Sequence, residues 1–168
     1  VPSSLCGIFG LKPTYGRLTR ARSFPFVASL DHLGPFARCT RDLALSYDVM
    51  QGSDPDDAGC ADHPQESTLP FLERGLDGLR IAVAGGYFRK GASPEALTAL
   101  DGVAKTLGAR EVEIPEAARA RAAAYVITTT EGAALHLDRL RKQAADFDPA
   151  VRDRLIEDDP DADPRNRA

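Results

Sequence analysis

The sequence has few of the residues that build metal centres and disulfide frameworks. It contains three cysteines and three histidines in 168 residues. Cys6, Cys39 and Cys60 are odd in number and far apart, form no CxxC pair, and have no pair of histidines near them at metal-ligand spacing. The usual signatures of a zinc site and of a disulfide framework are therefore excluded. Free thiols are typical of a reducing compartment, so we predict a cytoplasmic protein. Cys6 lies in the apolar run of residues 5–9 and is predicted to be a small buried residue.

Long apolar runs and an excess of positive charge are also missing. No stretch approaches the roughly 18 apolar residues of a membrane-spanning helix, so no membrane association is expected. Lysine and arginine together number 21 against 25 acidic residues, which gives a net charge of −4 and none of the basic footprint of nucleic-acid-binding proteins. Arg17, Arg20 and Arg22 do cluster, and we predict that they form a solvated edge of a loop rather than a phosphate site.

A polar loop without periodicity is predicted over residues 53–68. Its acidic residues and one neighbouring histidine are Asp54, Asp56, Asp57, Asp62 and His63. Their spacing fits neither the calcium-loop pattern nor a zinc set. We therefore predict a solvated acidic loop and no metal site.

Common catalytic and cofactor motifs are absent from the sequence. It has no GxSxG elbow, no HExxH and no P-loop, and the glycines after the predicted strand 79–84 do not form GxGxxG. Ser29, Asp31 and His32 are too close in the chain to converge as a catalytic triad. His136 is predicted to be a residue on a helix surface. From the residues alone, no cofactor and no catalytic group are predicted.

The pattern that is present predicts an α/β fold. A helix is expected from Thr40, as its N-cap, to Gly52. A strand over 79–84, a helix capped by Ser93 and ended by Gly108, and a strand over 110–114 follow. Strand, helix and strand in this order are typical of a βαβ unit with parallel strands.

One long helix, or two with a bend, is predicted over 116–145. Its inward-facing stripe is expected to consist of Val126, Thr130, Ala133, Leu137 and Leu140. A short helix restarts at Asp148-Pro149 and ends near residue 156. Residues 157–168 change abruptly in character, with two prolines and no large apolar residue, and are predicted to be a disordered or frame-shifted tail.

The order of several segments resembles the amidase signature family, the Ser-cisSer-Lys amidohydrolases. The resemblance starts with CGIFGLKPTYGRLTR, SLDHLGPFAR and RDLALSYDVM, and continues through GLRIAVAGGYF, EVEIP and AAYVITTTEGAALHLDRLR. Six elements in the family's order make the resemblance specific. It implies a mixed sheet core flanked by helices, truncated here at both ends, with residues 1–156 as a central to C-terminal portion of a single amidase domain.

The resemblance also implies an activity. In the family, a lysine acts through a bridging serine on a nucleophilic serine, and all three should precede Val1, so no catalytic residue is expected in this chain. Within the family, the sequence most resembles the 1-carboxybiuret hydrolase type. This resemblance implies hydrolysis of a small carboxybiuret- or ureide-like amide through an acyl-enzyme, with release of ammonia. One alternative is an amidotransferase A subunit that functions in tRNA-dependent amidation. Another is a catalytically inactive fragment or assembly surface.

Three residues are candidates for contact with the substrate by the same resemblance. Tyr125 falls on the second tyrosine of the AYY…EA pattern of amidotransferase A subunits, and core packing is its alternative role. Ser29 and Asp31 lie in the loop expected beside the active site, with turn and capping roles as alternatives. The partners implied are a small-molecule amide, further copies of the chain and a small helical accessory subunit. The sheet partners missing from the chain lead us to expect poor solubility in isolation.

Overall fold

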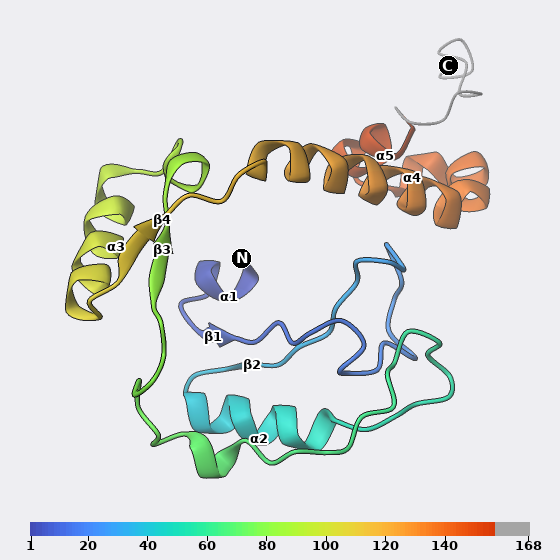
Figure 1. Ribbon diagram of the computed structural model, residues 1–168. Helices are drawn as coiled ribbons and strands as arrows, with labels where there is room; N and C mark the ends of the chain where they lie inside the picture. The colour runs from blue at the N-terminus through green and yellow to red at the C-terminus, as the bar shows by residue number, and fades with distance from the viewer. Residues whose placement is uncertain (157–168) are drawn as a thin grey trace. The chain divides into compact units, whose positions relative to one another are not determined.

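The computed structural model describes residues 1–156, so the predicted tail over 157–168 lies outside the described residues. The chain forms two compact units. The first consists of Val1–Gly75 and the chain from Ile127 onward, and the second of Leu76–Val126. The boundary between them falls inside the long helix α4 (Ala117–Gln143). Figure 1 colours both units by residue number.

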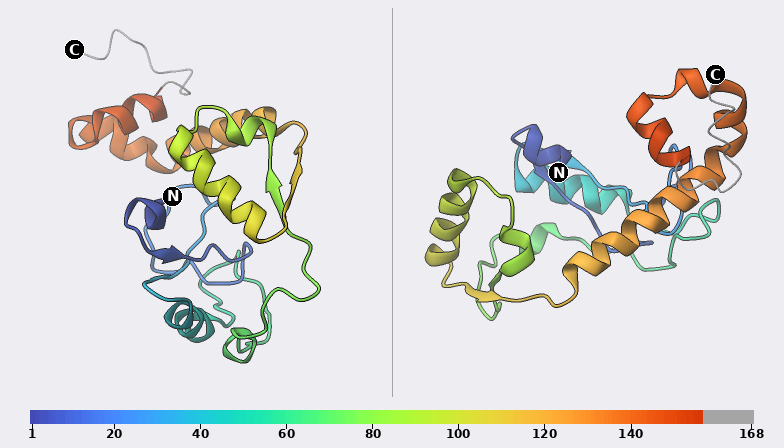
Figure 2. Two further views of the ribbon diagram at one scale, coloured as in Figure 1. Left: turned by 90° about the vertical axis from the view of Figure 1, so that its left-hand side faces the viewer. Right: turned by 90° about the horizontal axis from the view of Figure 1, so that it is seen from above.

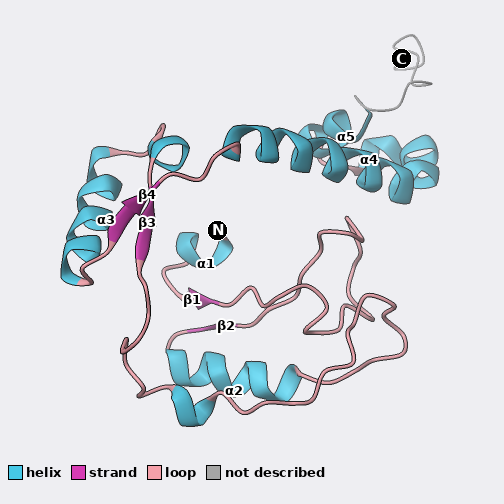
Figure 3. Cartoon of the chain, in the orientation of Figure 1, coloured by secondary structure: helices cyan, strands magenta, loops and turns pink. Residues whose placement is uncertain are grey.

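The first unit contains a small antiparallel strand pair that is covered by a helix. Its elements before the boundary are α1 (Pro2–Leu5), β1 (Phe9–Gly10), β2 (Phe36–Ala37), α2 (Thr40–Met50) and the 3₁₀ turn η1 (Leu69–Phe71). Phe9 pairs with Ala37 and Gly10 with Phe36, and α2 runs beside both strands (Figure 1). Long irregular segments, pink in Figure 3, connect these elements. The short helix α1 was not predicted from the sequence.

Helix α2 has the predicted length but a different cap. The N-cap residue is Cys39 rather than Thr40, and its Sγ accepts from the backbone N–H of Asp42 at 3.4 Å. Thr40 already has helical geometry and is the first residue of the helix. Asp42 lies in the first turn, where a negative charge stabilises the helix dipole. The sequence rule favoured threonine because thiols are rare caps, so the boundary is wrong by one residue.

The second unit is the predicted βαβ arrangement. Its elements are β3 (Ala82–Ala84), the 3₁₀ turn η2 (Gly86–Arg89), α3 (Pro94–Thr106) and β4 (Arg110–Val112). The two strands pair in parallel, with Val83 opposite Glu111. Both are shorter than predicted, at three residues each. The fold class is confirmed as α/β, with one parallel and one antiparallel strand pair.

Helix α3 is held at both ends by local signals that the sequence contains. Ser93 Oγ accepts from the N–H of Ala96 at 3.3 Å, and Pro94 occupies the first helical position. At the other end Gly108 adopts a φ of +62°, which glycine allows at low cost. Its N–H donates to Lys105 O, and the N–H of Ala109 donates to Ala104 O, which is a Schellman motif.

Helix α4 is followed by the 3₁₀ turn η3 (Ala144–Asp146) and helix α5 (Pro149–Ile156), so the predicted long helix and restart are confirmed. Asp148 Oδ1 accepts from the N–H groups of Ala150 and Val151 at 2.9 and 3.2 Å, which caps α5. Leu155 of α5 is 1% exposed. The turn between the end of α4 and α5 is visible in the right-hand view of Figure 2.

The buried stripe of α4 differs from the predicted one. Its buried members are Thr129, Gly132, His136 and Leu140, whereas Val126 and Thr130 are exposed. His136, predicted to lie on the helix surface, is only 6% exposed. Its ring stacks on Phe24 and Phe26, at centroid distances of 5.7 and 6.3 Å, and meets Phe147 edge-on. Aromatic partners that are remote in sequence therefore rotate the helix away from the face that hydrophobicity alone indicates.

The two helical glycines should respond oppositely to alanine. A Cβ on Gly102 of α3 meets no atom within 4 Å, so Gly102→Ala should stabilise the protein by about 1 kcal/mol through helix propensity. A Cβ on Gly132 would lie 2.9 Å from the Phe26 ring and 3.0 Å from Leu155 Cδ2. Gly132→Ala should therefore gain nothing or destabilise. Thermal unfolding of the two variants measures the difference, and equal shifts would contradict the packing around Gly132.

The apolar core of the described chain is small. Leu18, Val27, Ala44, Leu140 and Leu155 are its buried apolar residues, whereas many large apolar side chains are exposed. Cys6, predicted to be buried, is exposed at the end of the short helix α1, which contacts β1. The prediction of poor solubility in isolation stays a prediction.

Candidate functional site

Two charged segments that were predicted to be solvated form ion pairs with each other. The arginines of residues 17–22 meet the acidic loop 53–68. Their pairing unites Arg17, Arg20 and Arg22 with Asp54, Asp57 and Glu66, and places Asp56 at the rim. The predictions of a solvated arginine edge and of a solvated acidic loop are therefore wrong for the largely buried members of this set, such as Arg17, Arg20 and Asp57. Complementary charge, which single segments do not reveal, buries them together.

Arg20 and Asp57 form the centre of this network. Their side chains are 16% and 7% exposed, and Arg20 Nη2 lies 2.8 Å from Asp57 Oδ1. Arg20 Nε and the Arg20 N–H both donate to Asp57 Oδ2, at 3.1 and 2.8 Å, and the N–H of Gly59 donates to Oδ1 at 2.9 Å. The hydrogen bonds from Arg20 hold the pKa of Asp57 well below its usual range, and those to Asp57 raise the pKa of Arg20. The guanidinium also lies over the Tyr15 ring, 4.8 Å from its centroid.

Arg17 is held by a second set of polar contacts. Its Nε donates to the Tyr47 hydroxyl at 3.0 Å and its Nη2 to Gln51 Oε1 at 2.9 Å, and Glu66 lies 3.4 Å away. Gln51 is buried and also accepts from the N–H of Glu66. The hydrogen bond to Tyr47 is the largest cause of a raised pKa for Arg17. The loop that follows α2 is thereby tied to residues 17–20.

This network supports a tight turn over residues 27–31. The buried Val27 accepts from the N–H groups of Leu30 and Asp31 at 3.0 and 2.7 Å. Asp31 Oδ2 accepts from the N–H groups of Phe26 and Val27 at 2.8 and 2.9 Å, which closes the turn from inside. The carbonyl of Ala28 accepts from the Tyr15 hydroxyl at 3.0 Å and from Arg20 Nη1. Asp31 thus has the turn role that the sequence offered as its alternative, and its contact with substrate stays a prediction.

Ser29 lies at the exposed tip of this turn and is bound by α4. Its N–H donates to Glu131 Oε2 at 3.0 Å, and its hydroxyl makes a short hydrogen bond to Glu131 Oε1. These bonds lower the pKa of Glu131, so the carboxylate is ionised at neutral pH. Glu131 was not among the predicted site residues, although it is the glutamate of the segment compared with the AYY…EA pattern. That position in the pattern was the signal that could have identified it.

The third predicted site residue lies in the other unit. Tyr125 belongs to the second unit and is 48% exposed, while Ser29 and Asp31 belong to the first. Its predicted contact with the substrate stays a prediction. In the first unit, His32 contacts Tyr15 edge-on, at a centroid distance of 5.5 Å. Its Nδ1 lies 2.6 Å from the Leu30 carbonyl, and since a carbonyl only accepts, Nδ1 carries the proton.

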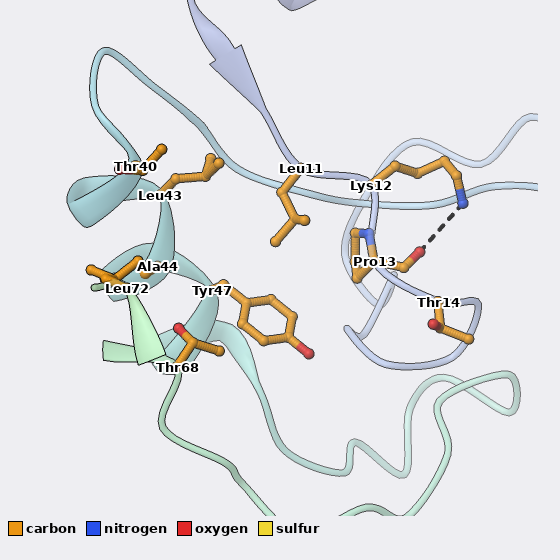
Figure 4. Close-up of a pocket in the computed structure, with 10 residues that line it drawn as sticks. All are labelled: Leu11, Lys12, Pro13, Thr14, Thr40, Leu43, Ala44, Tyr47, Thr68 and Leu72. Carbon is orange, nitrogen blue, oxygen red and sulfur yellow. Dashed lines mark hydrogen bonds between the residues drawn. The ribbon is translucent and has the colours of Figure 1, made fainter. Parts of the chain in front are cut away.

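A pocket of about 500 Å³ lies between the chain after β1 and helix α2 (Figure 4). It is lined by Leu11, Lys12, Pro13, Thr14, Thr40, Leu43, Ala44, Tyr47, Thr68 and Leu72. Lys12 Nζ points away from the apolar side chains toward the Pro13 carbonyl, at 3.4 Å. The lining contains no carboxylate and no imidazole, and its ionisable side chains are those of Lys12 and Tyr47.

Residues 1–156 contain neither a cluster of metal-ligating side chains nor a helix suited to a membrane. No group of three or more His, Cys, Asp or Glu side chains within these residues could hold a metal ion. Of the helices in the same range, none has the length and apolar character that crossing a membrane requires. The described residues therefore offer an anchored turn, a charge network and hydroxyl groups.

Comparison with known proteins gives consistent matches along the chain. The sequence model of the Amidase family matches residues 1–161. AtzE, a subunit of the 1-carboxybiuret hydrolase of Pseudomonas sp. strain ADP, is 54% identical over 157 residues, 93% of this chain and 34% of that protein. The A subunit of the glutamyl-tRNA(Gln) amidotransferase of Roseiflexus sp. strain RS-1 is 38% identical, over 92% of this chain and 37% of that protein. The chain spans about a third of the length of the curated relatives it matches.

Solved structures give the same order of similarity. A structure described as a vestigial protein complex that reveals the evolutionary origins of an s-triazine catabolic enzyme matches with a TM-score of 0.88 and 53% identity. It covers 93% of this chain and 34% of the other. The A subunit of the glutamyl-tRNA(Gln) amidotransferase of Thermotoga maritima matches with a TM-score of 0.73 and 27% identity, over the same shares of the two chains.

Proposed function

Because this chain belongs to the amidase family, we propose that it is a segment of an amidohydrolase that hydrolyses a small carboxybiuret- or ureide-like amide and releases ammonia. The observation that carries the proposal is the 54% identity to a 1-carboxybiuret hydrolase subunit over 93% of the chain. The identity to an amidotransferase A subunit over a similar share is 38%. The matches to both relatives cover more than nine-tenths of the chain.

We place both compact units in one amidase domain. The family match runs without interruption over residues 1–161 and so includes the unit boundary after Val126. A continuous match across a boundary supports one domain with two local clusters rather than two domains.

The chemistry proposed for the complete protein is acyl transfer to a serine. The serine oxygen attacks the amide carbon, the C–N bond breaks as the nitrogen takes a proton and leaves as ammonia, and water then hydrolyses the ester. By family resemblance the nucleophile and its lysine and serine partners precede Val1. The role of this chain is then to shape and support the substrate site, for which Ser29, Asp31 and Tyr125 are the candidate contacts.

The partners and location follow the same proposal. The relatives are named as subunits, and one solved relative is described as a protein complex. We propose that the complete protein acts in the cytoplasm, where it assembles with a small helical accessory subunit. An amidotransferase A subunit stays the second candidate, supported by the TM-score of 0.73 to the Thermotoga protein.

A hybrid enzyme tests the proposal. In the hybrid, the residues of this chain replace the matched residues of Pseudomonas AtzE, and the product is made together with the host's own partner proteins. We expect it to release ammonia from 1-carboxybiuret at a rate comparable with the host, because the transplanted residues meet the same surroundings. The control carries the matching segment of the Roseiflexus amidotransferase protein and should be much less active. If the two are equally inactive although both fold, the substrate assignment is wrong.

A further inference from the structure

One peptide bond of the exposed turn is gripped at both ends by opposite charges. Its carbonyl, that of Ala28, accepts from Arg20 Nη1 and from the Tyr15 hydroxyl. Its N–H, that of Ser29, donates to Glu131 Oε2 at 3.0 Å. A cation therefore faces the negative end of the peptide dipole, and an anion faces the positive end. We call this arrangement the peptide clamp.

The peptide clamp permits only one orientation of the peptide. If the peptide flipped, its oxygen would face the Glu131 carboxylate and its N–H would face the Arg20 guanidinium, and both contacts would be repulsive. Arg20 cannot follow such a flip, because Asp57 holds it through hydrogen bonds at 2.8 and 3.1 Å. The lowered pKa of Glu131 keeps the anionic end charged at neutral pH.

The arrangement does more than stabilise the turn. Ala28, Ser29 and Leu30 are exposed, so water could satisfy the polar groups of the turn. What converging charged anchors do supply is fixed geometry before a ligand binds.

Glu131 also fixes the polarity of the Ser29 hydroxyl. A carboxylate oxygen only accepts, so the hydroxyl proton points at Glu131 Oε1. The lone pairs of Ser29 Oγ are left to accept from another donor. A hydroxyl held in this way can accept a hydrogen bond from an N–H group, and amides and ureides have several N–H groups. It discriminates against a ligand group that can only accept hydrogen bonds.

We propose that Ser29 Oγ accepts a hydrogen bond from an N–H of the amide substrate, and that Glu131 is the positioning residue that fixes both the hydroxyl and the Ala28–Ser29 peptide. This assignment rests on the proposed amide hydrolysis and adds to it the chemical group by which the turn recognises its substrate. Arg20 and Tyr15 hold the opposite end of the same peptide.

The test measures the hydrolysis of 1-carboxybiuret by variants of the hybrid enzyme. Glu131→Gln can turn an N–H₂ group toward Ser29 and so reverse the polarity of the hydroxyl. We expect KM to rise roughly tenfold, the worth of about one hydrogen bond, with a smaller change in kcat. Ser29→Ala should have the same effect, Ser29→Thr should restore most of the affinity, and the double variant Ser29→Ala/Glu131→Gln should be no worse than either.

Controls separate positioning from folding. Glu116→Gln removes an exposed glutamate that forms an ion pair with Arg119 at the start of the same helix, and it should change neither KM nor kcat. Unchanged KM in both Glu131→Gln and Ser29→Ala would overturn the proposal. So would a lowered melting temperature with KM unchanged, because that result indicates a purely structural contact.

Hydrogen exchange keeps the test independent of activity. In Glu131→Ala, the peptide that contains the Ser29 amide should exchange faster than in the unsubstituted hybrid, and equal exchange would overturn the clamp. A hybrid that exchanges as expected but releases no ammonia contradicts the proposed function, and with it the substrate role of Ser29, while the clamp itself is supported.

Discussion

On its own, the 168-residue chain is expected to release ammonia from 1-carboxybiuret no faster than the uncatalysed reaction. The expectation rests on the proposal that the nucleophile, its bridging serine and the lysine precede Val1. Loss of a serine nucleophile with its partners costs on the order of 10⁶ in rate in other serine hydrolases, so the hybrid enzyme should exceed the isolated chain by at least about that factor. Ammonia release measured at equal concentrations of the two proteins gives the ratio.

The hydrogen bonding of Ser29 also leads us to expect no catalysis by the isolated chain. Its hydroxyl is bonded to a carboxylate whose pKa is lowered, which makes that carboxylate a weak base. As a control, the isolated chain is mixed with an inactive AtzE host protein. Ammonia release from 1-carboxybiuret then shows whether assembly of the two restores activity. Turnover by the isolated chain that Ser29→Ala abolishes would contradict the placement of the catalytic residues outside it.

Asp57→Ala is expected to lower the free energy of unfolding by about 2 kcal/mol, less than the usual cost of removing one partner of a buried ion pair. The substitution removes the acceptor of four hydrogen bonds and leaves the Arg20 guanidinium, 16% exposed, without its carboxylate. The cost is reduced because Arg20 keeps some access to water and its contacts with Tyr15 and Ala28. Chemical unfolding of the hybrid enzyme measures the change.

A neighbouring pair provides the matched control. Asp56 contacts Arg22 at 3.2 Å, and their side chains are 70% and 76% exposed. Asp56→Ala should therefore have little effect. Equal losses for Asp56→Ala and Asp57→Ala would show that burial of the Arg20–Asp57 pair does not decide its contribution.

The Arg20–Asp57 pair also makes the free energy of unfolding depend on pH. The folded-state pKa of Asp57 is lowered, so its contribution is fully present above the unfolded value near pH 4 and is lost as the pH falls through the folded-state pKa. Acidification below about pH 4 should weaken the unsubstituted hybrid, and the uncharged Asp57→Asn should lose less stability over the same interval.

Elements fixed by local signals could be predicted from the sequence. The caps of α3 depend on Ser93, Pro94 and Gly108, all within a few residues of the bonds they make. The parallel strands on either side of α3 follow from that local order. The phase of α4 could not be predicted, because the aromatic rings that bury His136 come from Phe24, Phe26 and Phe147, which lie outside that helix.

Long-range pairing of charges was likewise hidden. Arg20 and Asp57 are 37 residues apart, and each lies in a segment whose composition suits solvent. Ser29 and Glu131 are 102 residues apart, and only the fold brings them together. The sequence therefore located the turn of the candidate site through Ser29 and Asp31, but not the charged groups that hold it.

The central claim is that this chain belongs to a small-amide hydrolase rather than to an amidotransferase. The most direct measurement places the chain in two hosts, Pseudomonas AtzE and the A subunit of the Roseiflexus amidotransferase, and compares the kcat/KM that each host retains with its own substrate. We predict that the hydrolase host stays active and the amidotransferase host loses most of its activity. Full activity in the amidotransferase host, with loss in the hydrolase host, would contradict the claim.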